Sequence, residues 1–215
     1  MFASSSHDTQ LAAREKMVNE YLIERGIKDE KVLKAFRDVD RSLFVLPQDA
    51  ESAYEDTPLP IGFGQTISQP YIVAFMVERL RVKPQDRVLE IGTGSGYEAA
   101  ILGELAAKVY TIEVVKELYD RTTKLLASLH YKNVECRLGD GGEGIPDRAP
   151  FDKIILSAAP ENLPDALLEQ LKIGGLLIAP LGSIKLFQRL MMIEKLARGK
   201  YKETELMGVS FVEMV

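Results

Sequence analysis

The chain has 215 residues, of which 46% are hydrophobic and 27% charged, so it is long enough for one globular domain with a substantial core. It holds two histidines (His7 and His130), one cysteine and no tryptophan. A cysteine-rich zinc site, a histidine metal cage and a disulfide framework are therefore excluded, and no metal is expected. The net charge of −5 and the lack of any basic run disfavour nucleic acid as a partner.

The sequence predicts no targeting or membrane segment. The N-terminus lacks a basic start followed by an apolar stretch, and no apolar run approaches the roughly 18 residues that span a bilayer. A single cysteine is typical of a reducing compartment. We therefore expect a cytoplasmic protein that does not bind membranes, and we expect a monomer, although the sequence does not determine the oligomeric state.

Two helices are predicted before residue 40. The first ends at Gly26, because glycine suits the position just after a helix C-terminus. The second is short and has Asp29 at its N-cap. Their apolar faces, at helical spacing, are formed by Leu11, Met17, Val18, Tyr21, Leu22, Val32, Leu33 and Phe36.

Residues 54–70 are rich in proline, show no useful periodicity and predict a long loop. Such loops are uncommon inside compact domains and are more often functional than idle. An apolar helical run follows at residues 71–76. We expect Ser68 to be the N-cap of that helix, with Pro70 in its first turn.

From residue 87 onward, short apolar β-rich runs alternate with helical stretches. We expect strands at 87–91, 108–113, 134–138, 151–157 and 176–181, and helices near 95–106, 115–128 and 162–171. This alternation indicates a parallel sheet buried on both faces. The last forty residues instead predict two antiparallel strands joined at 197–200. The expected fold is α/β: a doubly wound, mostly parallel sheet with an antiparallel C-terminal edge and N-terminal helices.

The glycine-rich segment VLEIGTGSGY (88–97) follows the first parallel strand and opens a helix. A glycine loop in this setting binds nucleotide-like ligands. The dinucleotide fingerprint requires its third glycine at position 97, where this chain has Tyr97. The spacing therefore disfavours a nicotinamide cofactor, although a purely structural glycine turn remains an alternative.

Three carboxylates lie at or just after the ends of successive strands: Glu90, Glu113 and Asp140. In a doubly wound sheet these ends converge on one crevice. Glu113 is placed to accept both ribose hydroxyls, although an NAD enzyme would carry the same acid and a helix N-terminal acid is another explanation. Three acids with no lysine or arginine in the glycine loop favour a cationic ligand over a pyrophosphate. S-adenosylmethionine fits that description.

Several segments in order resemble the protein-L-isoaspartate O-methyltransferase family, from about residue 15 to 212. They are AYEDTPLPIGFGQTISQPYIVAFM (53–76), VLEIGTGSGYEAAIL (88–102), YTIEVV (110–115), GDGGEGIPDRAPFDKIILSAA (139–159) and LLEQLKIGGLLIAPLG (167–182). The glycine motif is shared by many S-adenosylmethionine methyltransferases. The PLPIGFGQTIS segment (58–68) is specific to this family.

The resemblance implies methyl transfer from S-adenosylmethionine to the α-carboxylate of L-isoaspartyl residues in damaged proteins and peptides, with S-adenosylhomocysteine as product. The ester then closes to a succinimide, whose hydrolysis partly restores aspartyl. By the same resemblance, Ser68 is the active-site hydroxyl, and Thr66 and Ile67 lie beside the substrate. The implied cofactor residues are Glu90, Gly92, Thr93, Gly94, Ser95 and Gly96 around the methionine part, Glu113 at the ribose, and Asp140 with Gly141 at the adenine.

The chain departs from the family pattern at several positions. Glu98 stands where an amide is common, Asp40 where proline is frequent, and His130 where glycine is usual. The C-terminus reads Phe-Val-Glu-Met-Val (211–215) and lacks the usual proline, leucine and terminal glycine. In the family this region lies near the peptide substrate, so the substrate side is where differences are expected.

We expect one methyltransferase domain over 1–215, with a helical and substrate segment (1–83), a cofactor-binding core (84–182) and C-terminal strands (183–215). Two other function classes remain possible from the residues alone. An NAD-dependent oxidoreductase would bind NAD more tightly than S-adenosylmethionine. A module that holds the cofactor without catalysis would not need Ser68, which would then serve only as a helix cap.

Overall fold

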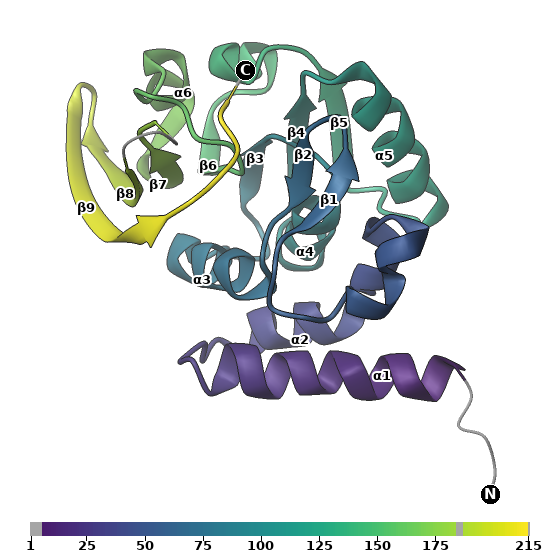
Figure 1. Ribbon diagram of the computed structural model, residues 1–215. Helices are drawn as coiled ribbons and strands as arrows, with labels where there is room; N and C mark the ends of the chain where they lie inside the picture. Colours follow the sequence, from purple (N-terminus) through teal and green to yellow (C-terminus); the bar gives the residue numbers. More distant parts are fainter. Residues whose placement is uncertain (1–5, 184–186, 215) are drawn as a thin grey trace, which may run out of the picture.

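The computed structural model describes residues 6–183 and 187–214. Its main sheet contains β3 (Arg87–Ile91), β4 (Lys108–Glu113), β5 (Val134–Leu138), β6 (Phe151–Leu156), β7 (Leu171–Leu181), β8 (Gln188–Ala197) and β9 (Lys200–Val209). The strand order is β5-β4-β3-β6-β7-β8-β9 (Figure 1). The strands from β5 to β7 pair in parallel, whereas β8 and β9 pair antiparallel at the other edge. The predicted α/β fold with an antiparallel C-terminal edge is confirmed.

The sheet is buried on both faces. Alternate strand residues point to opposite sides, so Val88 belongs to one apolar cluster and its neighbour Leu89 to the other. The first cluster is completed by apolar residues of the helices before β5, and the second by Leu167 and Ile145. Burial on both faces explains why the central strands β3, β4 and β6 are mostly apolar, whereas the edge strand β5 is half-buried and carries charged residues.

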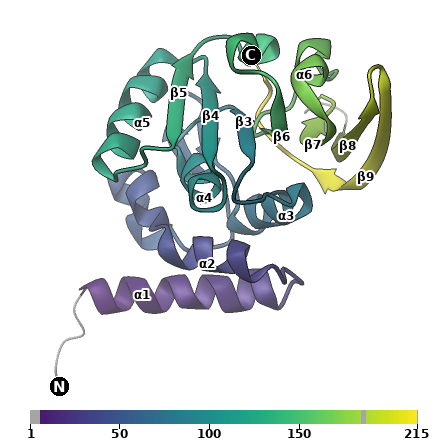
Figure 2. The same cartoon turned by 180° about the vertical axis from the view of Figure 1, so that it is seen from behind.

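The helices are α1 (Ser6–Lys16), α2 (Glu30–Asp38), α3 (Pro70–Leu80), α4 (Tyr97–Leu105), α5 (Lys116–Ser128) and α6 (Asp165–Gln170), with a π-helical stretch from Met17 to Ile23 after α1. Figures 1 and 2 show α1 lying across α2 on the side away from the sheet. Asp29 caps α2 as predicted, accepting from the amides of Lys31 and Val32. Within 6–183 and 187–214, no helix combines the length and apolar character needed to cross a membrane.

Two predicted boundaries were wrong. The last helix begins only at Asp165, because Pro164 occupies its N-cap, and ends at Gln170. The strand expected at 176–181 begins five residues earlier, at Leu171, where a register shift against β6 accommodates the extra length.

The stretch expected to be a long loop, 54–70, contains a small antiparallel hairpin. Its strands are β1 (Leu59–Gly62) and β2 (Gln65–Ile67). The turn between them carries three successive positive φ angles: 89° at Gly62, 56° at Phe63 and 72° at Gly64. Strands of four and three residues are too short for a period-2 pattern to be visible, so the hairpin could not be predicted from the sequence.

The N-cap of α3 also differs from the prediction. Gln69, not Ser68, is the N-cap residue, and its side chain makes no capping hydrogen bond. Asp56 performs the capping role from the preceding segment, because its carboxylate accepts the Tyr71 amide at 2.9 Å and the Gln69 side-chain amide at 2.7 Å. Ser68 is therefore not required to cap the helix.

Arg41 fixes the segment that leads into the hairpin. Its side chain is fully buried; Nε donates to the Ala53 carbonyl at 2.8 Å, and the guanidinium lies 5.0 Å from the Tyr97 ring centroid. We expect Arg41→Leu to lower the free energy of unfolding by about 2 kcal/mol, because a buried carbonyl loses its donor. Urea unfolding measures this change. An unchanged unfolding midpoint would show that the segment is held by other contacts.

Candidate active site

The glycine loop (residues 92–96) joins β3 to α4. Gly92, Gly94 and Gly96 have φ angles of 91°, 51° and 86°, which residues with a side chain rarely adopt. A Cβ on Gly96 would lie 2.6 Å from Cγ2 of Thr122, so this glycine also allows α5 to pack closely. The loop can therefore present its backbone to a ligand without an intervening side chain.

Glu113 ties this loop to the neighbouring strand. One carboxylate oxygen accepts the Gly94 amide at 2.8 Å, and the other accepts the amides of Val114 at 3.0 Å and Val115 at 2.9 Å. Thr122 Oγ1 completes the arrangement by donating to the Gly94 carbonyl at 2.7 Å. Glu113 is only 5% exposed, so its position is fixed by the backbone around it.

Two further carboxylates are buried in the same crevice. Glu90 is fully buried, and neither of its carboxylate oxygens has a hydrogen-bond partner within the described part of the chain. Glu98, in the first turn of α4, accepts from the Ser157 hydroxyl at 3.0 Å through one oxygen, while its other oxygen has no partner there. Burial, followed by the charge of Glu98, raises the pKa of Glu90 well above its usual range. Burial likewise raises the pKa of Glu98 to about 7. Buried polar atoms without partners are rare in proteins, and here they indicate a place for a ligand that donates hydrogen bonds or carries positive charge.

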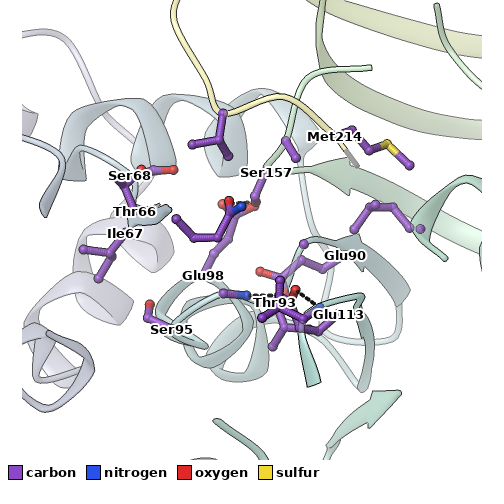
Figure 3. Close-up of a pocket in the computed structure, with 18 of the residues that line it drawn as sticks. Thr66, Ile67, Ser68, Glu90, Thr93, Ser95, Glu98, Glu113, Ser157 and Met214 are labelled. Carbon is purple, nitrogen blue, oxygen red and sulfur yellow. Dashed lines mark hydrogen bonds between the residues drawn. The ribbon is translucent and has the colours of Figure 1, made fainter. Parts of the chain in front are cut away.

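The opposite wall of the crevice comes from two segments that are distant in sequence (Figure 3). The end of β2 contributes Thr66 and Ile67, and Ser68 follows directly. The C-terminal segment runs back from β9 toward the strand ends and contributes residues 212–214. Ala159 holds that segment by donating to the Val212 carbonyl at 2.8 Å and accepting the Met214 amide at 3.0 Å.

A second cavity adjoins the first. Thr66, Ser68, Ser157 and Val212 line both cavities. The far part of the second cavity is bordered by Arg25, Pro58, Gln69, Ile72, Phe187 and residues 207–211. Ser68 therefore lies at the junction between the carboxylate-lined crevice and the groove formed by the second cavity.

The structure brings together most of the residues that the sequence marked as a site. The residues that line the crevice are Thr66, Ile67, Ser68, Glu90, Gly92, Thr93, Gly94, Ser95, Glu113 and Gly141. Gly96 does not line it and faces α5 instead. Asp140 is exposed, and its side chain accepts the Gly142 amide at 2.7 Å, capping the turn that follows β5.

Ser157, Glu213 and Met214 also line the crevice, although the sequence did not predict them as site residues. Ser157 directly follows β6, so its place at the carboxyl end of a central parallel strand was a usable signal. Met214 approaches the Gly141–Gly142 turn: its Cε lies 3.2 Å from where a Cβ on Gly141 would be. No local pattern could have indicated this contact, because it depends on the path of the chain after β9.

No lysine, arginine or histidine is among the described residues that line the crevice, so its charged side chains are all carboxylates. An anionic pyrophosphate does not suit these surroundings, whereas the ammonium, sulfonium and hydroxyl groups of S-adenosylmethionine do. Together, the doubly wound sheet and this crevice define an S-adenosylmethionine-dependent methyltransferase.

Comparisons with known proteins give the family within this class. The model of the protein-L-isoaspartate(D-aspartate) O-methyltransferase family matches residues 12–215. The protein-L-isoaspartate O-methyltransferase of Synechococcus sp. (strain JA-2-3B'a(2-13)) is 48% identical over 97% of this chain and 87% of its own length. The protein-L-isoaspartate O-methyltransferase 2 of Shewanella sediminis is 50% identical over 95% of this chain and 83% of its own length. The chain belongs to the protein-L-isoaspartate O-methyltransferase family.

Two solved structures agree with this assignment. One, described as a protein-L-isoaspartate O-methyltransferase, superposes with a TM-score of 0.83 and 26% identity; the match covers 93% of this chain but only 65% of that one. The other is a putative enzyme of the same kind from Plasmodium falciparum in complex with S-adenosyl-L-homocysteine. It gives a TM-score of 0.81 and 26% identity over 96% of this chain and 98% of that one.

Proposed function

We propose that this chain is a protein repair enzyme that transfers a methyl group from S-adenosylmethionine to the α-carboxylate of L-isoaspartyl residues in damaged proteins and peptides. The ester closes to a succinimide, and hydrolysis returns part of the material to aspartyl. The observation that carries the proposal is the junction at Ser68, where an acidic crevice without cationic lining residues meets the groove formed by the second cavity. Membership of the family supports the same reaction.

The crevice fits the cofactor through groups that are otherwise unsatisfied. Both oxygens of Glu90 lack a partner within the described residues, and they suit the ammonium of the methionine part. Glu113 would accept the ribose hydroxyls, and the turn at Gly141 would border the adenine. Thr93, Gly94 and Ser95 would line the binding site of the methionine part. Gly96 would instead shape the glycine loop, and Asp140 would shape the turn that follows β5.

The groove fits an extended peptide whose isoaspartyl carboxylate reaches Ser68. Thr66 and Ile67 precede this hydroxyl on β2, and Thr66 borders both cavities. Phe187, with 62% of its surface exposed, lies at the far part of the groove and offers apolar contact to a flanking residue. Ser68 is free to bind substrate because Asp56 caps α3.

The reaction requires little of the protein beyond positioning the substrate carboxylate and the cofactor. A carboxylate with an ordinary pKa of about 3–4 is already ionised at pH 7, so no general base is needed. S-adenosylmethionine, when bound, supplies an electrophilic methyl group on a sulfonium that is a good leaving group. The chain's own residues hold the two reactants in line, and such alignment can contribute roughly 7–11 kcal/mol at best.

The remaining assignments follow from this function. Residues 1–83 would carry the substrate side, 84–182 the cofactor core and 183–215 the edge strands of one domain. The enzyme would act in the cytoplasm on proteins and peptides, not on nucleic acid or membranes. We also propose that the enzyme is a monomer.

A pair of peptides that differ only in one linkage tests the proposal. We expect transfer of labelled methyl from S-adenosylmethionine to the L-isoaspartyl peptide and none above background to its normal aspartyl twin. The aspartyl twin is the matched control, since it has the same composition and charge. Equal labelling of both peptides, or of neither, would contradict the proposed function.

A further inference from the structure

Glu98 occupies a position in the cofactor crevice that the reaction described above does not use. It is 7% exposed, lies in the first turn of α4 and lines the crevice. Figure 3 shows its side chain directed toward Ser157, whose hydroxyl donates to one of its oxygens. Its other oxygen is buried without a partner among the described residues. Glu98 is therefore a buried carboxyl with one unsatisfied acceptor at the ligand site.

The titratable groups around Glu98 are almost all acidic. The carboxyls that line the same crevice are Glu90 from β3, Glu113 from the end of β4 and Glu213 from the C-terminal segment. Tyr97 precedes Glu98 on α4, and burial, which outweighs the effect of Arg41, raises the pKa of its phenol beyond the physiological range. On β5, burial raises the pKa of the Cys136 thiol to about 11, so it stays neutral. Arg41 packs against the Tyr97 ring at 5.0 Å and does not line the crevice.

Two buried carboxyls with no cation between them cannot both be ionised without cost, and the pair retains a proton. The charge of Glu98 is among the causes that raise the pKa of Glu90, so the two carboxyls are electrostatically linked. A ligand ammonium placed against the pair supplies the missing positive charge. The fully ionised pair then becomes the favoured form.

We propose that Glu98 acts with Glu90 as a paired carboxylate site for the cationic part of the cofactor, and that the pair releases one proton to solvent when the cofactor binds. This inference rests on the proposed function. The amide common in the family at position 98 could accept a hydrogen bond but could not release a proton. Glu98 is thus a specificity-determining residue that makes cofactor affinity depend on pH.

The direction of the pH dependence follows from the proton balance. The empty site holds the proton below about pH 7, so binding must expel it and affinity is lower there. Above that pH Glu98 is already ionised and contributes no proton on binding. Affinity should therefore rise about tenfold between pH 6 and pH 8 and then level off.

Isothermal titration calorimetry with S-adenosylhomocysteine, which carries the ammonium and is stable in solution, tests this directly. Titrations in two buffers of different ionisation enthalpy, at pH 6, 7 and 8, give the number of protons released. We expect the number of protons released to fall by close to one between pH 6 and pH 8, as Glu98 becomes ionised in the empty site. In Glu98→Gln, the proton that belongs to Glu98 should no longer be released, and the dissociation constant should depend less on pH over this range.

Two other variants separate the pair from general charge effects. Glu104→Gln removes an exposed acid from the same helix and should behave like the unmodified protein. Ser157→Ala removes the hydrogen bond that lowers the pKa of Glu98, so the pH at which affinity levels off should move upward. A wild-type affinity independent of pH, or a Glu98→Gln variant with an unchanged pH profile, would overturn the inference.

The ligand-free protein gives a second readout that does not require binding. The folded pKa of Glu98 lies above its value in the unfolded chain, so the unfolded state binds fewer protons between about pH 4.5 and pH 7. As the pH rises through that window, the thermal midpoint of the wild type should fall relative to that of Glu98→Gln. If the isoaspartyl and aspartyl peptides are labelled equally while these profiles hold, the proposed reaction fails and the paired carboxylate site stands.

Discussion

Replacing Ser68 with alanine is expected to lower kcat/KM for an isoaspartyl peptide by about 10- to 150-fold. A hydrogen bond from a neutral hydroxyl to a carboxylate contributes about 1.5–3 kcal/mol, and each 1.4 kcal/mol is a factor of ten. The carboxylate loses charge as the methyl group is transferred, so Ser68 contributes mainly by binding and orienting it. The variant should therefore show a higher KM for the peptide together with a lower kcat. Initial-rate assays with labelled cofactor measure both.

Because Asp56 and not Ser68 caps α3, the Ser68→Ala variant should affect the reaction without destabilising the helix. Asp56 accepts the Tyr71 amide and also forms an ion pair with Arg25, so loss of the Ser68 hydroxyl should leave the thermal midpoint within about 1 °C. Ser68→Thr retains a hydroxyl and should recover part of the activity. Asp56→Ala is the converse control, because it removes the cap and should lower the midpoint. Unchanged methylation by Ser68→Ala would show that the hydroxyl has no role in the reaction.

The elements that the sequence predicted well are those buried in the sheet. Residues 87–91 and 108–113 are strands with the expected bounds, because a parallel strand covered on both faces is mostly apolar and ends at glycine or charged residues. The half-buried strand at 134–138 also has the expected bounds. The turn residue His130 illustrates the same local logic. Its φ of 64° is a conformation that glycine adopts easily, which accounts for the glycine usual in the family at this position.

The parts that could not be predicted depend on contacts between distant segments. Glu98 and Ser157 are 59 positions apart, and nothing near either residue indicates their hydrogen bond. The capping of α3 by Asp56 replaces a local Ser68 cap that was equally reasonable from sequence. Similarly, Met214 reaches the crevice only because residues 212–214 pair with Ala159. Such choices are settled by tertiary packing, which propensity and periodicity do not encode.

Replacing Glu113 with glutamine is expected to weaken the binding of S-adenosylhomocysteine by about 100-fold. The proposed contact is two ribose hydroxyls donating to one carboxylate, each worth about 1.5–3 kcal/mol, reduced by the amide oxygen that remains. The same carboxylate accepts the amides of Gly94, Val114 and Val115, so the glycine loop should also loosen and the thermal midpoint should fall. Calorimetry at pH 8, where Glu98 is ionised, measures the affinity without interference from the Glu98 proton.

A double-mutant cycle separates ribose binding from loop shaping, because only the first depends on the ligand hydroxyls. The 2′-deoxy analogue of S-adenosylhomocysteine should bind the unmodified protein at least tenfold more weakly than the parent compound. In Glu113→Gln the difference between the two ligands should shrink, since only the weaker amide oxygen remains to accept from the ribose. Glu117→Gln, an exposed acid in the first turn of α5, should preserve the full difference. If Glu113→Gln still discriminates between the ligands as the unmodified protein does, Glu113 supports the loop alone and another group must hold the ribose.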